Sequence, residues 1–127
     1  MRAVRSARAK GRLAERAAER LLRRKGCVIL ARNWRGAGGE IDLAALQGRT
    51  LVFCEVKYRS RGFEPDRPAV ASGQRARTAR AARAFRNRYG VGRLAYRFDL
   101  VTVTGDPAHP EHIDWQTNYS RTGMERS

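Results

Sequence analysis

Two stretches of the chain carry apolar residues at the spacing of an amphipathic helix. In the first, Leu13, Ala17 and Leu21 recur every four residues, and a lysine followed by a glycine ends the run. This spacing and this ending predict a helix over residues 11–25. Residues 69–89 repeat the helical spacing, with arginines bordering the apolar stripe and glycines directly after it. The pattern therefore predicts two helices that lie far apart in the chain.

The segments between and after the two helices have the apolar clustering typical of β-strands. We expect strands, the last one short, over residues 27–31, 40–46, 50–58, 96–104 and 112–115. The order is α-β-β-β-α-β-(β), which predicts an α/β protein with a mixed sheet flanked by helices. Because strands and helices do not alternate throughout, the order argues against a doubly wound nucleotide-binding sheet.

The length of 127 residues suits one domain with frayed ends. We expect a basic flexible arm or a helix start over residues 1–10, a single domain over 11–116 and a flexible tail over 117–127. No run of about 18 apolar residues and no signal segment occurs, so we expect a cytoplasmic protein that does not enter a membrane. Cys27 and Cys54 lie in apolar runs, which is typical of reduced thiols in a core.

Basic residues outnumber acidic residues by 27 to 12, which gives a formal net charge of +15. The excess is concentrated in two blocks. Residues 1–35 hold 12 basic and 2 acidic residues, and residues 67–98 hold 9 arginines and no acid. An arginine-rich genome would explain the number of arginines, but not why the acids are sorted away from these blocks. The distribution favours a polyanionic partner, and we expect that partner to be nucleic acid.

Two consecutive predicted strands form a hairpin whose register brings acidic residues together. With a two-residue turn at positions 48 and 49, or a four-residue loop about the same centre, Asp42 faces Glu55. By the same register Glu40 faces Lys57. Directly opposed side chains have Cβ atoms about 4.5–5.5 Å apart, where two like charges are destabilising. We therefore expect a positive group between the acids, either the ammonium of Lys57 on the same strand face or a divalent cation.

The combination of Asp42, Glu55 and Lys57 suits metal-dependent hydrolysis of a phosphodiester bond. Mg²⁺ or Mn²⁺ prefers carboxylate oxygens and takes its other ligands from water and from the phosphate of the substrate. The two carboxylates would hold the ion, and the lysine would orient the attacking water or stabilise the developing charge. The alternative is that these acids are surface carboxylates paired with the abundant arginines.

Short motifs spread over residues 10–116 occur together in this chain. They are Gly-Arg-Leu-Ala-Glu (11–15), Arg-Asn-Trp-Arg (32–35), Gly-Glu-Ile-Asp-Leu (39–43), Val-Phe-Cys-Glu-Val-Lys-Tyr-Arg (52–59), Ala-Val (69–70) and Arg-Phe-Asp (97–99). In combination they resemble the YraN-type proteins, a largely uncharacterised bacterial family assigned to the PD-(D/E)xK nuclease superfamily, near the archaeal Holliday-junction resolvases. The resemblance implies a restriction-endonuclease-like fold, with Asp42 and Glu55 as metal ligands and Lys57 as the catalytic lysine.

The resemblance also bears on other residues and on the substrate. Glu15 matches an acidic position that such nucleases often aim at the site, although it is equally well placed beside Glu19 on a solvated helix face. Glu40 either supports the metal or pairs with Lys57 as part of the structure. Where relatives usually carry Lys-Gln after Ala-Val, this chain has Gln-Arg at 74–75, so Arg75 replaces a phosphate-contacting lysine or the contact is lost. Structured or branched DNA, rather than RNA, is the implied substrate, and a homodimer is the implied assembly.

Three functions fit the sequence. The first is an endonuclease with a metal at Asp42 and Glu55 and with Lys57, Glu15 and Glu40 as catalytic candidates. The second is a non-catalytic module that binds nucleic acid and keeps its carboxylates for stability. The third is an accessory protein that docks on acidic partner proteins. In the first two, the arginines expected to contact nucleic acid are Arg32, Arg35, Arg59, Arg75, Arg77 and Arg80.

Three further features have structural interpretations. Residues 36–39 are rich in glycine but lack the Lys-Ser/Thr of a phosphate-binding loop, so we expect a turn there. Trp34 precedes this turn and is more consistent with a buried anchor than with a platform for a base. Asp99, within a predicted strand, is expected to form a structural ion pair with Arg97 of a neighbouring element.

Overall fold

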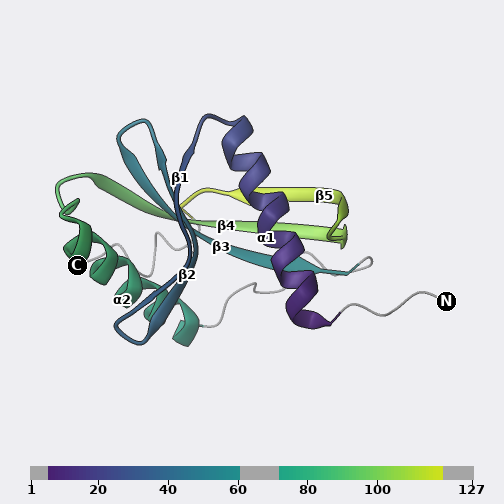
Figure 1. Ribbon diagram of the computed structural model, residues 1–127, viewed down its shortest axis with the longest axis horizontal. Coiled ribbons are helices and arrows are strands. Elements are labelled where there is room, and N and C mark those ends of the chain that lie inside the picture. The colour runs from purple at the N-terminus through teal and green to yellow at the C-terminus, as the bar shows by residue number, and fades with distance from the viewer. Residues whose placement is uncertain (1–5, 61–71, 119–127) are drawn as a thin grey trace.

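The computed structural model describes residues 6–60 and 72–118 of the chain (Figure 1). Two helices and a five-stranded sheet make up the fold, in the order that the sequence predicts. The elements are α1 (Ala7–Arg24), β1 (Val28–Gly36), β2 (Gly39–Gln47), β3 (Thr50–Arg59), α2 (Ser72–Tyr89), β4 (Ala95–Asp106) and β5 (His109–Gln116). A mixed sheet flanked by helices is confirmed, and it is the arrangement expected of a restriction-endonuclease-like α/β fold.

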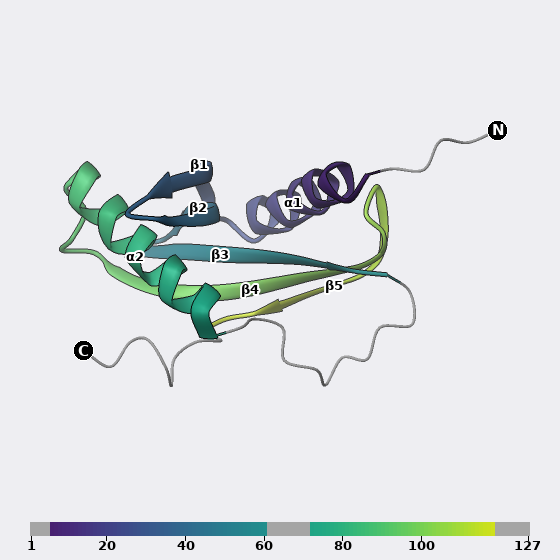
Figure 2. The ribbon, with the colours of Figure 1, turned by 90° about the horizontal axis from the view of Figure 1, so that it is seen from below.

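The strands follow one another across the sheet in the order β1-β2-β3-β4-β5. Among the described strands, β3 and β4 form the one parallel pair. Helix α2 lies between them in the chain and carries the backbone back to the end of the sheet where β3 begins, so β4 runs in the same direction as β3. The two helices cover opposite faces of the sheet (Figure 2). Along β3 the side chains alternate accordingly: Val52 and Cys54 pack with α1, and Leu51 and Phe53 pack with α2.

Helix α1 begins earlier than the apolar pattern predicts. The Ser6 side chain caps it by accepting a hydrogen bond of 3.1 Å from the backbone N–H of Ala9. Residues 7–10 are therefore the first turn of a helix and not part of a flexible arm, whereas residues 1–5 and 119–127 lie outside the described residues. In the described part of the chain, no helix has the length and apolar character needed to cross a membrane.

The strands are also longer than predicted at one end or both. Strand β1 runs five residues past the expected end, because its pairing with β2 continues to Gly36 and Gly39 beside the turn. Strand β5 begins three residues before the expected segment, pairing along β4. Helix α2 begins at Ser72 in the described residues, so the predicted start at residue 69 is not covered.

The β2–β3 hairpin has the register predicted from its two-residue turn. Leu43 pairs with Cys54 and Gln47 with Thr50, and Gly48 in the turn has a φ of 62°. Regular pairing reaches only as far as Leu43, so the predicted cross-strand pairs Asp42–Glu55 and Glu40–Lys57 are not part of the ladder. At the next position the carboxylate of Asp42 accepts a hydrogen bond of 2.8 Å from the backbone N–H of Val56. At the point where the two strands diverge, a side-chain carboxylate thus replaces a backbone carbonyl as the acceptor for the N–H of β3.

The aromatic core under α2 explains the position of Trp34. Its ring packs edge-on against Phe85 with centroids 5.3 Å apart, and its indole Nε1 donates to the hydroxyl of Tyr89 at 3.2 Å. Phe85 in turn packs edge-on against Phe53 of β3 at 5.7 Å. Trp34 is therefore confirmed as an anchor that fixes the end of β1 on the helix.

A buried polar cluster at the other side of the sheet surrounds Asp99. Its carboxylate accepts hydrogen bonds from Arg97 Nε at 3.0 Å, from Trp115 Nε1 at 2.8 Å and from the backbone N–H of Asn118 at 3.0 Å. The ion pair with Arg97 is thus formed, but within β4 and not between neighbouring elements. Residues two apart on a strand project from the same face, which is why a pair within one strand suffices. The two cysteines are buried and free, as predicted.

The turn between β1 and β2 lies directly on α2. A Cβ atom at Gly39 would collide with the backbone carbonyl of Arg77, so only glycine permits this approach. We expect Gly39→Ala to lower the free energy of unfolding by about 1–3 kcal/mol, because the turn must move away from the helix. Urea denaturation measures this loss. Gly92→Ala is the matched control, since a Cβ atom there has nothing within 4 Å; an equal effect of the two substitutions would contradict the expectation.

Candidate active site

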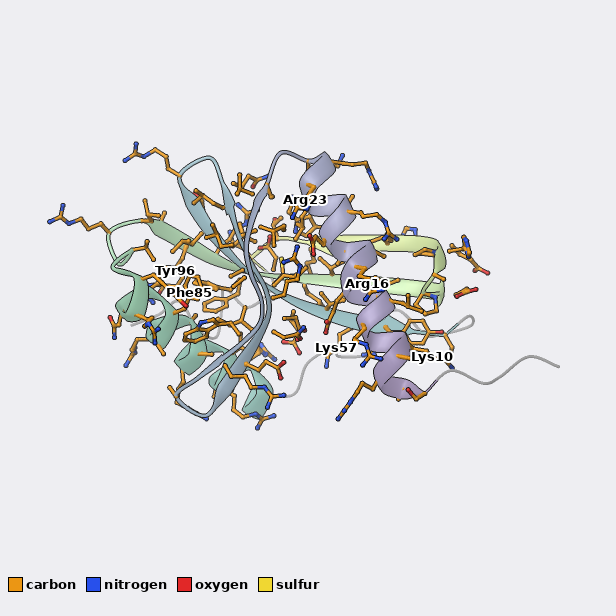
Figure 3. The ribbon with its side chains drawn as sticks, in the orientation of Figure 1. Lys10, Arg16, Arg23, Lys57, Phe85 and Tyr96 are labelled. Carbon is orange, nitrogen blue, oxygen red and sulfur yellow. The ribbon has the colours of Figure 1, made fainter. Side chains whose placement is uncertain are left out.

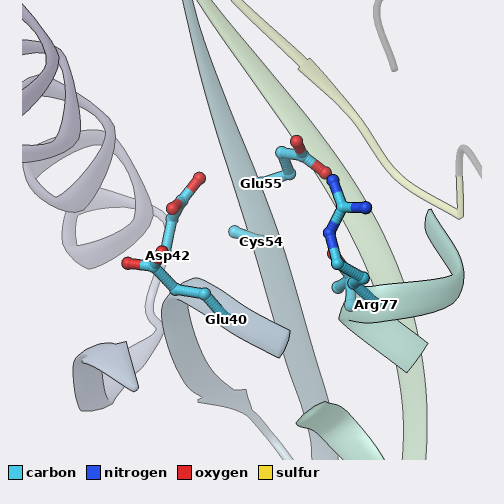
Figure 4. A pocket seen from close by; sticks show the side chains of 6 residues that line it. Glu40, Asp42, Cys54, Glu55 and Arg77 are labelled. Carbon is cyan, nitrogen blue, oxygen red and sulfur yellow. The ribbon is translucent and has the colours of Figure 1, made fainter. Parts of the chain in front are cut away.

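A cavity of about 150 Å³ lies between the sheet and the beginning of α2 (Figure 4). Glu40 and Asp42 approach it from β2, Glu55 from β3 and Arg77 from α2. The residues that line it are Glu40, Asp42, Cys54, Glu55, Arg77 and Thr78. The structure therefore brings the two carboxylates predicted as metal ligands to one cavity, on adjoining strands.

Asp42 has a strongly raised pKa in this cavity. Burial raises the pKa of its carboxyl to about 7, and the nearby charges of Glu15, Glu55 and Glu40 act in the same direction. The hydrogen bond from the N–H of Val56 opposes this rise, because it favours the charged form. Four carboxylates from three different elements thus share one electrostatic neighbourhood.

Glu55 and Lys57 form an ion pair along β3. The Nζ atom of Lys57 lies 3.3 Å from Oε2 of Glu55, whose side chain is only 4% exposed. The Lys57 side chain is 22% exposed, so its ammonium is within reach of solvent or of a bound molecule. In the view of Figure 3, Lys57 and Phe85 lie on opposite sides of the twisted β1–β2 hairpin. The prediction that Lys57 and Glu55 project from one strand face is confirmed.

Glu15 and Glu40 stand at the margin of this cluster. Glu15 comes from α1, where burial raises its pKa and a hydrogen bond of 3.3 Å from Asn33 Nδ2 opposes the rise. Its charge helps to raise the pKa of Asp42, but Glu15 lines a different cavity, together with Glu19 and Asn33. Glu40 is more exposed, and its carboxylate lies 3.8 Å from the guanidinium of Arg35.

The arginines predicted to contact nucleic acid fall into two groups. Near the cavity, Arg77 lines it, Arg35 pairs with Glu40, and the Nε atom of Arg80 donates to the carbonyl of Ala37 at 3.3 Å. These three residues surround the β1–β2 turn.

The remaining three predicted arginines have other surroundings. Arg32 is bound to Glu19 by hydrogen bonds of 2.7 and 2.6 Å, which raise the pKa of its guanidinium. Arg59 donates to the carbonyl of Tyr58 at 3.1 Å. The Nε atom of Arg75 is buried and has no hydrogen-bond partner among the described residues. The structure does not bring these three together around the carboxylates.

Sequence reasoning missed the contribution of Thr78. This residue is buried and lines the cavity, although its position in the sequence suggests only one more member of the apolar face of α2. The signal was present, because Thr78 is the polar side chain in a helical stripe that continues with Ala81, Ala82 and Phe85. A polar residue at a core position is a reason to look for a polar cavity beside it.

The donor set decides which metal would fit. Within residues 6–60 and 72–118, no three His, Cys, Asp or Glu side chains gather closely enough to hold an ion by themselves. Zn²⁺ in a structural site requires four such ligands. Mg²⁺ and Mn²⁺ accept one or two carboxylates and complete their shell with water and phosphate oxygens. Asp42 and Glu55 bring two carboxylates, the type of donor that Mg²⁺ and Mn²⁺ accept.

Comparison with known proteins gives the family. The model of a group described as uncharacterised protein family UPF0102 matches residues 14–103. The chain belongs to the UPF0102 family. A UPF0102 protein of Solibacter usitatus is 45% identical over 96 residues, which cover 73% of this chain and 73% of that protein. One from Frankia alni is 39% identical over 113 residues, which cover 88% of this chain and 94% of that protein.

Another UPF0102 protein, from Oleidesulfovibrio alaskensis, is 42% identical over 104 residues. The match covers 81% of this chain but only 52% of that longer protein. Membership in UPF0102 confirms the resemblance to YraN-type proteins. The matched segment contains all the acids of the cluster and Lys57. The family description names no reaction, so the function of a UPF0102 protein has to be argued from its site.

Proposed function

We propose that this UPF0102 protein is a metal-dependent endonuclease that hydrolyses phosphodiester bonds in structured or branched DNA. The observation that carries the proposal is that Asp42 and Glu55 line one cavity while the ammonium of Lys57 lies 3.3 Å from Glu55. Two carboxylates at a shared cavity, with a lysine paired to one of them, are the groups that a metal-assisted attack of water on a phosphodiester requires.

Asp42 and Glu55 would hold the ion from two adjoining strands. The pKa of about 7 at Asp42 reflects burial and the repulsion of neighbouring carboxylates, and a divalent cation would offset the repulsion. When bound, Mg²⁺ or Mn²⁺ supplies a positive charge beside the phosphate and lowers the pKa of a coordinated water.

Lys57 would supply a positive charge next to the ion. Its Nζ atom pairs with Glu55 and, at 22% exposure, can donate to the attacking water or to a phosphate oxygen. Glu40 and Glu15 are not assigned as ligands of the ion, but their charges act on Asp42. We assign both glutamates a positioning role. Glu15 acts through the hydrogen bond that it accepts from Asn33, and Glu40 acts through its ion pair with Arg35.

The charge of the chain supports a nucleic acid as substrate. A net charge of +15 attracts a polyanion over a distance, and the three arginines around the β1–β2 turn lie beside the acidic cavity. The preference for branched DNA comes from the resemblance to resolvases alone.

A second candidate is a module that binds nucleic acid without cleaving it. The ion pair between Lys57 and Glu55 favours it, because the ammonium already offsets part of the acidic charge without a metal. In that case the carboxylates would serve the stability of the hairpin, and only the basic surfaces would contact the ligand.

A cleavage assay separates the two functions. Linear, flapped and four-way DNA is incubated with the protein and Mg²⁺ or Mn²⁺, and Asp42→Asn is compared with wild type. Asp114→Asn, at an exposed position of β5, is the matched control. We expect cleavage by wild type and control and at least an approximately hundredfold loss in Asp42→Asn. Equal cleavage by all three proteins would refute the site, and binding without cleavage in any of them would establish the module.

A further inference from the structure

A second cavity, of about 530 Å³, adjoins the acidic one at the β1–β2 turn. Its lining residues are Arg35, Gly36, Gly38, Gly39, Glu40 and Arg77. Glu40 and Arg77 also line the cavity that contains Asp42 and Glu55, so these two side chains form a wall common to both. A molecule long enough to enter both cavities would pass over this wall.

The backbone of the turn is fixed in place. Ala37 and Gly38 have φ angles of 54° and 78°, which is the conformation of a two-residue hairpin turn with both central residues left-handed. The turn rests on α2 through the close approach of Gly39 to the carbonyl of Arg77. Arg80 Nε donates to the carbonyl of Ala37 from the same helix. The cavity is therefore a built feature, and the turn presents backbone to it because three of its lining residues are glycines.

The side chains that face the cavity suit an anion. Arg35 and Arg77 bring two guanidinium groups, and Glu40 brings the single carboxylate, which lies 3.8 Å from Arg35. The Arg35 side chain is 79% exposed, so it is free to turn from this long ion pair toward a ligand. A guanidinium can hold two oxygens of a phosphate through parallel hydrogen bonds, which one distant carboxylate oxygen does not satisfy.

We propose that this turn cavity is a second phosphate subsite, which binds the backbone phosphate next to the scissile one. The inference rests on the proposed nuclease function, because the acidic cavity then receives the scissile phosphate. The nucleic acid strand runs from the β1–β2 turn, across Glu40 and Arg77, to Asp42 and Glu55. Arg35 exchanges its contact with Glu40 for a contact with the incoming phosphate. Substrates that carry two adjacent phosphates therefore bind more tightly than substrates that carry one.

Two substitutions at matched exposed arginines test the subsite. Arg35→Gln removes the charge at the turn cavity. Arg49→Gln removes one at the β2–β3 turn, at the opposite end of β2. Affinity for a fluorescent oligonucleotide is measured by anisotropy in EDTA at several salt concentrations. We expect Arg35→Gln to bind about tenfold more weakly than wild type and to lower the slope of log affinity against log salt by about 1. Arg49→Gln should stay close to wild type, and equal behaviour of the two variants would overturn the subsite.

A second arm uses the size of the substrate. Bis(4-nitrophenyl) phosphate has one phosphate and can place it only at the acidic cavity, whereas an oligonucleotide has a second phosphate for the turn cavity. With Mn²⁺ present, Arg35→Gln should lower kcat/KM about tenfold for the oligonucleotide and leave it unchanged for the small diester. An equal loss on both substrates would place Arg35 at the scissile phosphate and refute a separate subsite. If neither substrate is cleaved by any variant, the nuclease function fails, while the binding arm still decides whether the turn cavity holds a phosphate.

Discussion

Lys57→Met is expected to lower the turnover number for DNA cleavage by about 10²- to 10³-fold, which corresponds to about 3–4 kcal/mol of transition-state stabilisation. Methionine keeps an unbranched apolar stem of similar length but removes the charge that lies 3.3 Å from Glu55. If the ammonium acts mainly on the attacking water or on developing charge, kcat falls and KM changes little. Single-turnover and steady-state kinetics with Mn²⁺ measure how the effect is divided between kcat and KM.

Controls separate catalysis from stability in this experiment. Lys25→Met removes a charge at the exposed end of α1 and should cleave like wild type. Because Lys57→Met leaves the buried Glu55 without this cation, its melting temperature must be recorded alongside. Lys57→Arg keeps the charge and the fold but replaces a compact ammonium by a planar fork, so it should remain stable and still cleave slowly. Wild-type turnover in Lys57→Met would show that the lysine only neutralises Glu55.

Local rules explain how much of the site could be predicted. The register of the β2–β3 hairpin follows from the two-residue turn at Gly48, and it places Asp42 and Glu55 on adjoining strands without any long-range information. The period of two along a strand places Lys57 beside Glu55. These short-range constraints were sufficient to predict that the two carboxylates lie on adjoining strands and that the lysine lies beside one of them.

The surroundings of the site depend on tertiary packing, which the sequence does not express locally. Glu15 reaches the cluster because α1 packs across the sheet and Asn33 adopts a left-handed φ of 49°. Arg77 and Thr78 reach the cavity because α2 packs on the opposite face and touches Gly39. Charge patterning located the arginine-rich helix but not which of its residues face the acids. The same reasoning misplaced the start of α1, whose cap at Ser6 lies inside a basic segment that resembles an arm.

The metal-free protein is expected to lose stability as pH rises from about 4 to about 7, and Asp42 is the main cause. In the unfolded chain this carboxyl has a pKa near 3.8, whereas in the folded protein burial and neighbouring acids raise the pKa to about 7. A raised pKa means that the folded state favours the protonated form. The stabilising contribution is therefore complete below pH 4 and is lost through pH 7. At 1.36 kcal/mol per pKa unit the loss is up to about 4 kcal/mol.

Asp42→Asn isolates this contribution. Asparagine has no charge at any pH and can still accept the hydrogen bond from the N–H of Val56. In EDTA, urea denaturation should give nearly equal free energies of unfolding for variant and wild type at pH 4, and a more stable variant at pH 8. Glu15 and Glu19 also have shifted pKa values, but they are present in both proteins. Asp114→Asn, at an exposed position, should follow wild type throughout.

Adding Mn²⁺ at pH 8 completes the argument, because a cation that binds only the folded state stabilises it by mass action. Wild type should regain stability as Mn²⁺ is added, while Asp42→Asn should gain little, since one of its two carboxylates is gone. The substitution would then raise the stability of the metal-free protein and remove its response to metal, which is the behaviour of a site whose charge is kept for function at a cost in stability. Parallel pH curves for the two proteins, or equal responses to Mn²⁺, would show that Asp42 is an ordinary structural carboxylate.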